Sequence, residues 1–191
     1  GLDVPWDVDA SCPDALWFTE QKGLVYRLNL QTGEQKRMLA LTDVLYRKSY
    51  GLLGMAVHPQ KNYVFLHYTY EANDTSLTSM VKSRLVRFDI KGDTLTNRFV
   101  LLDNIPGNTF HNGSRILLSP DDKVIFSMGD AGRADETQND AVLVGKIMRL
   151  NMDGSIPDDN PIPGSPVWSK GHRNPQGLAF GRNNVLYSSE H

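Results

Sequence analysis

The chain repeats a hairpin unit four times. Each copy begins with a short apolar run, passes through a turn rich in Pro, Asp, Asn or Gly, and ends in a second apolar run. This is the pattern of strand, turn and strand. The copies begin at Val8, Met55, Ile116 and Leu178, so successive copies start 47, 61 and 62 residues apart. A long period of this kind is typical of a propeller or a solenoid.

Further strand patterns after the hairpins favour the propeller. Alternating apolar and polar residues predict third strands at Leu24–Leu30, Ser83–Ile90 and Lys146–Asn151, and candidate fourth strands at Gln35–Leu41 and Arg98–Leu102. Four antiparallel strands per repeat form one blade of a β-propeller. We therefore predict an all-β fold in which residues 1–191 form a single domain of three to three and a half four-stranded blades. The expected blades cover about 1–46, 47–107 and 108–165, with a partial blade at 166–191.

The composition is that of a globular domain. Hydrophobic residues make up 40% of the chain and charged residues 22%, and the formal net charge of −2 argues against a general role in binding nucleic acid. No apolar run approaches the roughly 20 residues that span a bilayer, and no basic-apolar leader precedes the first strand. Because Cys12 is the single cysteine, neither an intramolecular disulfide nor a cysteine metal site is expected. Asn73-Asp74-Thr75 and Asn112-Gly113-Ser114 fit the glycosylation pattern, and we interpret both as coincidental.

Repeat geometry brings three ionisable side chains to one end of the blades. His111 and Arg173 each stand five residues before the start of a hairpin copy, and each is followed by an asparagine. The first strands of neighbouring blades open on one face of a propeller, so we expect the two side chains to converge. The third hairpin runs away from this face and returns to end at Asp130, which brings that carboxylate to the same place.

These three residues suit acid–base chemistry. A carboxylate beside an imidazole orients the ring and stabilises the imidazolium, so His111 and Asp130 form a candidate general base. Arg173 offers a permanent charge and a fork of donors for an oxyanion or an anionic cofactor. The alternative for each residue is structural: a hydrogen-bonded histidine, a turn carboxylate and a salt-bridge arginine. Asn112 and Asn174 can likewise cap backbone amides at the strand ends.

Beyond these residues, a set of motifs resembles the glucose/sorbosone dehydrogenase family, the soluble aldose dehydrogenases that use pyrroloquinoline quinone (PQQ) on a six-bladed β-propeller. The matching segments cover nearly the whole chain and are Val4-Pro5-Trp6-Asp7, Thr19-Glu20, Gly51-Leu52-Leu53-Gly54-Met55-Ala56-Val57-His58-Pro59, Gly145-Lys146-Ile147-Met148-Arg149-Leu150-Asn151, Asp153-Gly154-Ser155-Ile156-Pro157, Asp159-Asn160-Pro161, Gly171 to Phe180, and Ser189-Glu190-His191.

The resemblance implies a function and roles for individual residues. The family oxidises the anomeric carbon of an aldose to the lactone, with hydride transfer to PQQ. By resemblance, His111 removes the proton of the anomeric hydroxyl and Asp130 orients His111. Arg173 then contacts the quinone oxygens, and Asn174 and Gln176 line the cofactor site. His191 stands where some members place a cofactor-lining glutamine.

The resemblance also implies partners and a location. A sugar substrate, a separate electron acceptor and Ca²⁺ are implied, but the family's calcium ligands match no position up to His191, so no metal ligand is assigned. A periplasmic or secreted protein is expected. Because six blades need more residues, we expect residues 1–191 to be the N-terminal part of a longer protein that is inactive alone. Exposed blade edges would then favour self-association.

Two other functions remain open at the level of sequence. The first is a propeller that serves as a binding module without catalysis, since the scaffold tolerates loss of chemistry. The second is a sugar lactonase of the propeller type, which relies on a divalent cation in the channel with carboxylate and asparagine ligands. Failure to bind quinone would favour the first, and metal-dependent cleavage of a lactone without quinone would identify the second.

Overall fold

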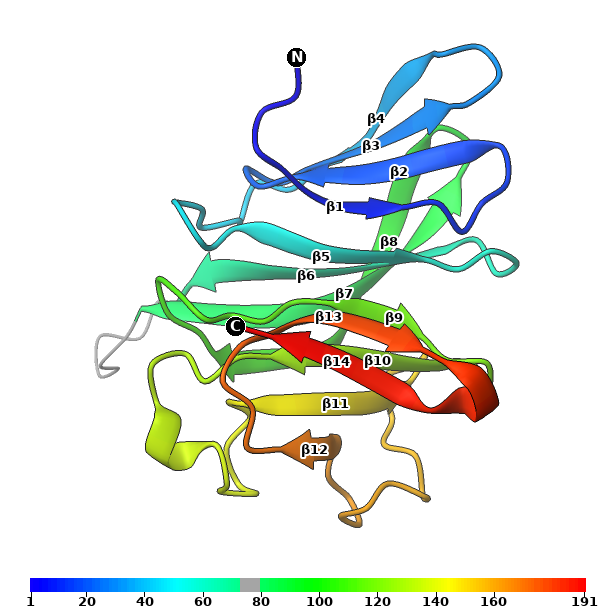
Figure 1. The fold of residues 1–191 in the computed structure, drawn as a ribbon. Helices are drawn as coiled ribbons and strands as arrows, with labels where there is room; N and C mark the ends of the chain where they lie inside the picture. The colour runs from blue at the N-terminus through cyan, green and yellow to red at the C-terminus, as the bar shows by residue number, and fades with distance from the viewer. Residues whose placement is uncertain (73–79) are drawn as a thin grey trace.

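The computed structural model describes residues 1–72 and 80–191, and it consists of antiparallel sheets joined by loops (Figure 1). The Asn73-Asp74-Thr75 triplet lies outside the described residues. The strands of the first sheet are β1 (Pro5–Asp9), β2 (Ala15–Glu20), β3 (Leu24–Asn29) and β4 (Gln35–Ala40). Those of the second are β5 (Leu52–Val57), β6 (Tyr63–Glu71), β7 (Val81–Lys91) and β8 (Thr94–Pro106). Those of the third are β9 (Ile116–Leu118), β10 (Lys123–Met128), β11 (Lys146–Asn151) and β12 (Val167–Lys170). A hairpin of β13 (Pro175–Phe180) and β14 (Leu186–Glu190) follows.

The sheets are the blades of a β-propeller, which confirms the predicted fold class. Within each sheet the strands are paired in chain order, and the first strands of consecutive blades lie side by side, β1 against β5, β5 against β9 and β9 against β13 (Figure 1). Two short 3-10 turns, Ala134–Glu136 and Arg182–Asn184, lie in the loops. Within the described ranges, no helix has the length and apolar character needed to cross a membrane.

The strand pairing confirms the alignment of the hairpin copies. Val8 pairs with Phe18, Met55 with Leu66, Ile116 with Phe126 and Leu178 with Ser188, always between the first and second strand of a blade. Each copy therefore places its first apolar residue at the same position of the blade.

The third blade differs from the sequence-based expectation in its outer strand. Its fourth strand is β12, Val167–Lys170, which pairs with β11 and lies past the expected boundary at about 165. A long connection rich in Pro, Gly and Asp separates β11 from this strand. The four residues of β12 are too few to show the alternation by which the other strands were predicted. The strand β8 is also longer than the predicted Arg98–Leu102.

Apolar side chains fill the space between neighbouring blades. The fully buried Phe65 and Leu85 of the second blade pack with Phe126 and Met148 of the third, and a second cluster joins the first blade to the second. Burial of each such side chain contributes about 1.5–3 kcal/mol. The blades are therefore held face to face mainly by hydrophobic packing, and this fixes the strand ends that carry the polar residues.

An arginine on the third strand of each blade faces the next blade. Arg27 pairs in register with Trp17, Arg87 with Phe65 and Arg149 with Ile125. Arg27 Nη2 lies 3.0 Å from Asp93 of the second blade, and Arg87 Nη1 donates to the Met152 carbonyl of the third at 2.9 Å. These two arginines therefore tie neighbouring blades together.

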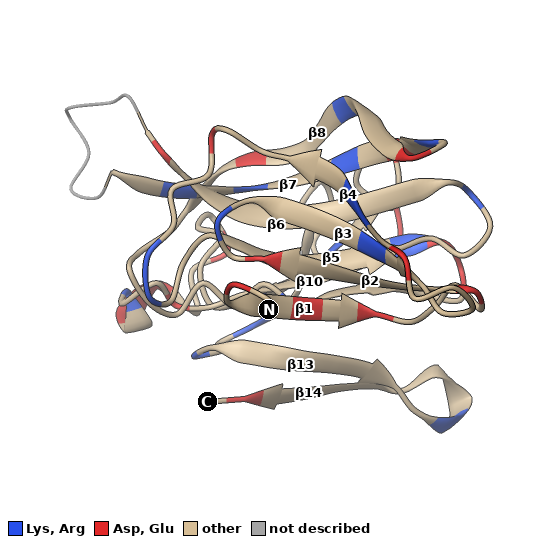
Figure 2. Cartoon of the chain, turned by 90° about the horizontal axis from the view of Figure 1, so that it is seen from above, with Lys and Arg blue, Asp and Glu red and all other residues tan. Residues whose placement is uncertain are grey.

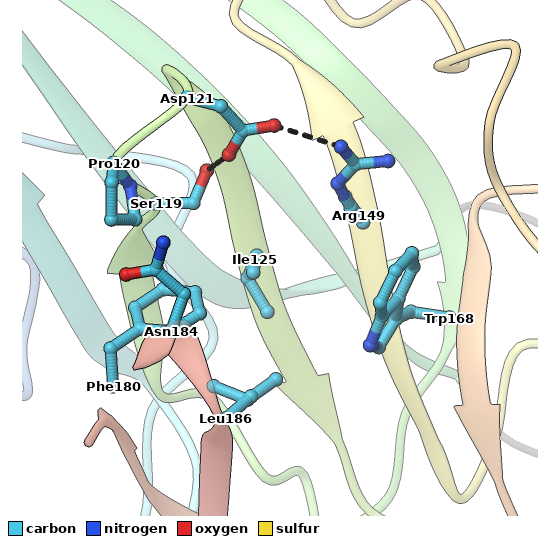
Figure 3. A pocket seen from close by; sticks show the side chains of 9 residues that line it. All are labelled: Ser119, Pro120, Asp121, Ile125, Arg149, Trp168, Phe180, Asn184 and Leu186. Carbon is cyan, nitrogen blue, oxygen red and sulfur yellow. Dashed lines mark hydrogen bonds and ion pairs between the residues drawn. The ribbon is translucent and has the colours of Figure 1, made fainter. Parts of the chain in front are cut away.

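Arg149 instead lies at the wall of an open groove. Its guanidinium is paired with Asp121 and Asp159 and lies 5.0 Å from the centre of the Trp168 ring. The groove, of about 660 Å³, runs between the third blade and the β13–β14 hairpin (Figure 3). Over the residues that the structure describes, Lys and Arg are interspersed with Asp and Glu (Figure 2).

Candidate active site

Irregularities in the first strands shape a cavity at one end of the blades. The pairing register shifts between Pro5 and Val8 in β1, between Leu52 and Met55 in β5, and between Pro175 and Gly177 in β13. Shifts of this kind turn side chains that a regular strand would point elsewhere. The residues inside them include Trp6, Leu53 and Gln176, and all three line one cavity of about 360 Å³. Its other lining residues are Ser49, Phe110, His111, Asn112, Gly113, Asn174 and His191.

The segment that leads into β9 has an unusual backbone. His111, Gly113 and Ser114 all adopt positive φ angles, of 55°, 60° and 94°. For a residue other than glycine this conformation costs on the order of 1 kcal/mol or more and is concentrated at functional sites. A Cβ atom on Gly113 would lie 2.7 Å from the Ser127 carbonyl oxygen, so the segment packs directly on β10. The strain is therefore held in place by close backbone packing.

His111 and Asp130 form the predicted pair. His111 Nδ1 lies 2.9 Å from Asp130 Oδ1, which also accepts the Gly132 amide at 2.9 Å. The Asp130 side chain is 7% exposed and that of His111 is 18% exposed. An ionised carboxylate only accepts hydrogen bonds, so the proton lies on Nδ1 and Nε2 is the acceptor nitrogen of the ring. The contact with Asp130 therefore fixes the orientation of the His111 ring.

The other predicted residues occupy different parts of the site. Asn174 is buried, and its Oδ1 accepts the Gly113 amide at 3.0 Å, which joins the β13 end to the His111 segment. Gln176 lines the cavity, whereas Arg173 is exposed and does not line it. The Arg173 guanidinium donates to the ring Nδ1 of His191 and, at 2.9 Å, to its carbonyl oxygen. Arg173 therefore stands at the rim of the cavity, next to one of its lining residues.

Sequence reasoning missed Trp6, Leu53 and Phe110 as lining residues. The missed signal is an offset: Trp6, Leu53 and Gln176 each stand two residues before the start of a hairpin copy. The prediction used an offset of five, which found His111 and Arg173. Among the residues that the structure describes, no group of three or more His, Cys, Asp and Glu side chains is placed to hold a metal ion.

A second histidine, His67, contacts Ser114 in the segment 111–114 that leads into β9. The fully buried His67 lies with its Nδ1 2.7 Å from Ser114 Oγ, and that oxygen accepts the Gly54 amide at 2.9 Å. The tautomer of His67 decides which of these two atoms donates the proton, and His67 Nε2 has no hydrogen-bond partner among the described residues. Burial lowers the pKa of His67 from 6.5 to about 3. The ring stays neutral at physiological pH.

Buried His67 gives the protein a defined acid sensitivity. The unfolded chain binds a proton on this ring below pH 6.5, whereas the folded ring stays neutral down to about pH 3. Its contribution to stability is thus complete above pH 6.5 and is lost progressively as the pH falls toward 3, at up to about 1.4 kcal/mol per pH unit. The His67→Asn variant keeps a hydrogen-bond partner for Ser114 Oγ. The decrease in its free energy of unfolding with falling pH should therefore be smaller than that of the wild type. Urea unfolding between pH 7.5 and 4.5 measures it, and equal slopes in both proteins would refute the assignment.

Comparison with known proteins gives a consistent picture. Residues 2–191 match the model of the glucose/sorbosone dehydrogenase family. The chain is 33% identical to quinoprotein glucose dehydrogenase B of Acinetobacter calcoaceticus over 92% of its own length and 43% of that protein. It is 27% identical to the aldose sugar dehydrogenase YliI of Escherichia coli, covering 100% of this chain and 54% of that protein.

Solved structures agree with the sequence comparisons. The PQQ-bound aldose sugar dehydrogenase of Streptomyces coelicolor superposes with a TM-score of 0.87 and 30% identity, over 100% of this chain and 57% of that one. The soluble aldose sugar dehydrogenase of Escherichia coli in its apo-form also gives a TM-score of 0.87, at 25% identity. The chain spans about half the length of these relatives. From its blade architecture and the match over residues 2–191, the chain belongs to the glucose/sorbosone dehydrogenase family.

Proposed function

We propose that the protein is a PQQ-dependent dehydrogenase that oxidises the anomeric carbon of an aldose to the lactone. The observation that carries this proposal is the His111–Asp130 pair at 2.9 Å beside a cavity, on a backbone segment with positive φ. Two relatives support it, one a quinoprotein glucose dehydrogenase and one an aldose sugar dehydrogenase in its PQQ-bound form.

In this proposal His111 moves one proton. Its Nε2 accepts the proton of the anomeric hydroxyl, while Nδ1 keeps its proton toward Asp130 Oδ1. Once the ring has accepted this proton it is positively charged, and the buried Asp130 carboxylate stabilises that charge. Because Asp130 also accepts the Gly132 amide, its carboxylate is fixed before the reaction begins. The ring therefore needs no reorientation when it takes the proton.

The donor set of the cavity fits a flat molecule rich in carbonyl oxygens. Asn174 and Gln176 line the cavity with amide groups, Arg173 stands at its rim beside His191, and Trp6 and Phe110 add aromatic surface. We assign Arg173, Asn174 and Gln176 to hold PQQ. When bound, PQQ supplies the hydride acceptor, which no side chain can provide. Arg173 then neutralises negative charge near the cavity, and Trp6 and Phe110 exclude water.

The whole protein's partners follow from this chemistry. Turnover requires an aldose and a separate electron acceptor, and we propose both as partners. We also propose a periplasmic or secreted location, as the family resemblance implies. The Ca²⁺ that the resemblance implies is assigned to no residue of this chain. These proposals concern the full-length protein.

Cofactor binding and product identity test the proposal together. The protein is titrated with PQQ by tryptophan fluorescence, since Trp6 lines the cavity, and is then incubated with an aldose panel and an electron-accepting dye. We expect saturable quinone binding and a lactone product that requires quinone. A folded protein that neither binds quinone nor forms product would favour a binding module. Hydrolysis of an added lactone that requires only a divalent cation would favour a lactonase.

A further inference from the structure

Arg115, which follows directly on the His111–Ser114 segment, has no part in the chemistry described above. Its Nη1 forms a close ion pair with Asp7 of β1, and its Nε donates to the Gln176 carbonyl of β13 at 3.0 Å. One side chain from the third blade therefore contacts the first strands of the first blade and of the β13–β14 hairpin. Both contacts fall inside the register shifts that shape the cavity.

Asp7 extends this connection to the second blade. The Asp7 carboxylate is 4% exposed and accepts the Val8 and Met55 amides, each at 2.9 Å. Burial raises the pKa of Asp7, and the charge of Arg115 acts in the opposite direction. The first strands β1, β5 and β13 are thus joined through one ion pair, of a buried Asp7 with a partly exposed Arg115, at the end of the blades where the cavity lies.

The contact with Gln176 is part of a paired arrangement. Ser127 Oγ accepts the Arg115 amide at 3.0 Å and donates to the Pro175 carbonyl at 2.8 Å. Two consecutive carbonyl groups of β13 are therefore bound by side chains of the third blade, one by Ser127 and one by Arg115. Together with the Asn174–Gly113 bond, this fixes the backbone on which Asn174 and Gln176 stand.

We infer that Arg115 is a positioning residue that sets Trp6 and Gln176 relative to His111. Trp6 precedes Asp7, and the Gln176 carbonyl is itself a ligand of Arg115, so the guanidinium holds the backbone on two sides of the cavity. The charge of Arg115 is compensated by Asp7, which argues against its use as an anchor for an anionic group. This inference rests on the proposed function for its effect on catalysis, but its effect on the backbone is independent of that function.

The Arg115→Lys variant tests the inference because it retains the charge. Lysine is a point donor and cannot reproduce the fork that reaches both Asp7 and Gln176. In the apo-protein as its gene encodes it, we expect faster hydrogen–deuterium exchange in the peptide that covers residues 174–180. We also expect kcat/KM and quinone affinity to fall about 10- to 100-fold, because misplacement by about 1 Å has effects of this size.

The matched control is Arg149→Lys. Arg149 also forms ion pairs at a strand, with the two carboxylates of Asp121 and Asp159, but it lies by the groove of Figure 3 among residues that do not line the cavity. This variant should lower Tm while its quinone affinity and kcat remain those of the wild type.

The possible outcomes separate this inference from the proposed function. If Arg115→Lys lowers Tm as Arg149→Lys does, without a change in exchange at residues 174–180, kcat/KM or quinone affinity, the role of Arg115 is structural only and the inference is wrong. If the wild type neither binds quinone nor oxidises aldoses, the proposed function fails, and the exchange measurement still decides the role of Arg115.

Discussion

Replacing His111 by alanine should lower kcat for aldose oxidation about 100- to 10,000-fold, the range expected for loss of a general base. The variant loses the acceptor Nε2, and its Asp130 keeps only the Gly132 amide of its two partners described above. Quinone affinity should change much less, because Asn174 and Gln176 remain. Steady-state kinetics at saturating PQQ, together with a quinone titration, measure the two effects separately.

His58→Asn is the matched control for the loss of an imidazole. His58 Nδ1 accepts the amides of Gln60 and Lys61, both at 3.1 Å, and does not line the cavity. An asparagine oxygen can replace that acceptor, so this variant should retain wild-type kcat. A His111→Ala protein that is folded, binds quinone and turns over within about threefold of the wild type would rule out the proton transfer assigned to His111.

Replacing Gly54 by alanine should prevent stable folding. A Cβ atom on Gly54 would lie 1.6 Å from the carbonyl oxygen of Ser114, and this neighbour is backbone that cannot rotate away. The same approach allows the Gly54 amide to bind Ser114 Oγ at 2.9 Å, so separation of the strands also breaks this bond. We expect a loss of more than about 4 kcal/mol, measured by urea unfolding or, if no folded protein is recovered, by soluble yield.

Gly164→Ala separates the clash from the general cost of replacing glycine. An added Cβ at Gly164 meets nothing within 4 Å, but its φ of 73° is unfavourable for alanine. This variant should lose only about 1–2 kcal/mol. If Gly54→Ala were no less stable than Gly164→Ala, the second and third blades would not approach as closely as described here.

The sequence predicted the blade architecture because the four hairpin copies begin at equivalent positions of their blades. Val8, Met55, Ile116 and Leu178 were aligned by their apolar runs alone, and the strand pairing places them at equivalent positions. Within each blade the first three strands either alternate apolar with polar residues or are mostly apolar, and both patterns can be recognised in the sequence. The His111–Asp130 contact could also be predicted, since a hairpin must bring its end back beside its beginning.

The rest of the site depends on backbone details that have no simple pattern. The cavity is lined by Trp6 and Leu53 because β1 and β5 shift register just before their apolar runs, and one extra residue changes the direction of every later side chain. The same holds for Arg115, whose partner Asp7 lies 108 positions away in the chain. The short strand β12 was not predicted because four residues are too few to show an alternation of apolar and polar residues.

Arg173 shows the limit of reasoning from repeat equivalence. It occupies the same position relative to Leu178 as His111 does to Ile116, yet His111 lines the cavity and Arg173 stands at the rim with His191. The difference is local: His111 has a φ of 55° and binds Asp130, whereas the Arg173 amide donates to Glu190 Oε2 at 2.9 Å. Equivalent positions therefore bring residues to one end of the blades but do not set the direction of their side chains.

The pH dependence of kcat/KM tests the general-base assignment most directly. The profile for aldose oxidation at saturating PQQ is recorded for the wild type and for His111→Ala. Because His111 must be neutral to accept a proton, wild-type kcat/KM should show an acid limb, that is, a fall as the pH is lowered. The variant should lack this limb over the same range. An identical acid limb in both proteins would contradict the assignment of His111 as the base.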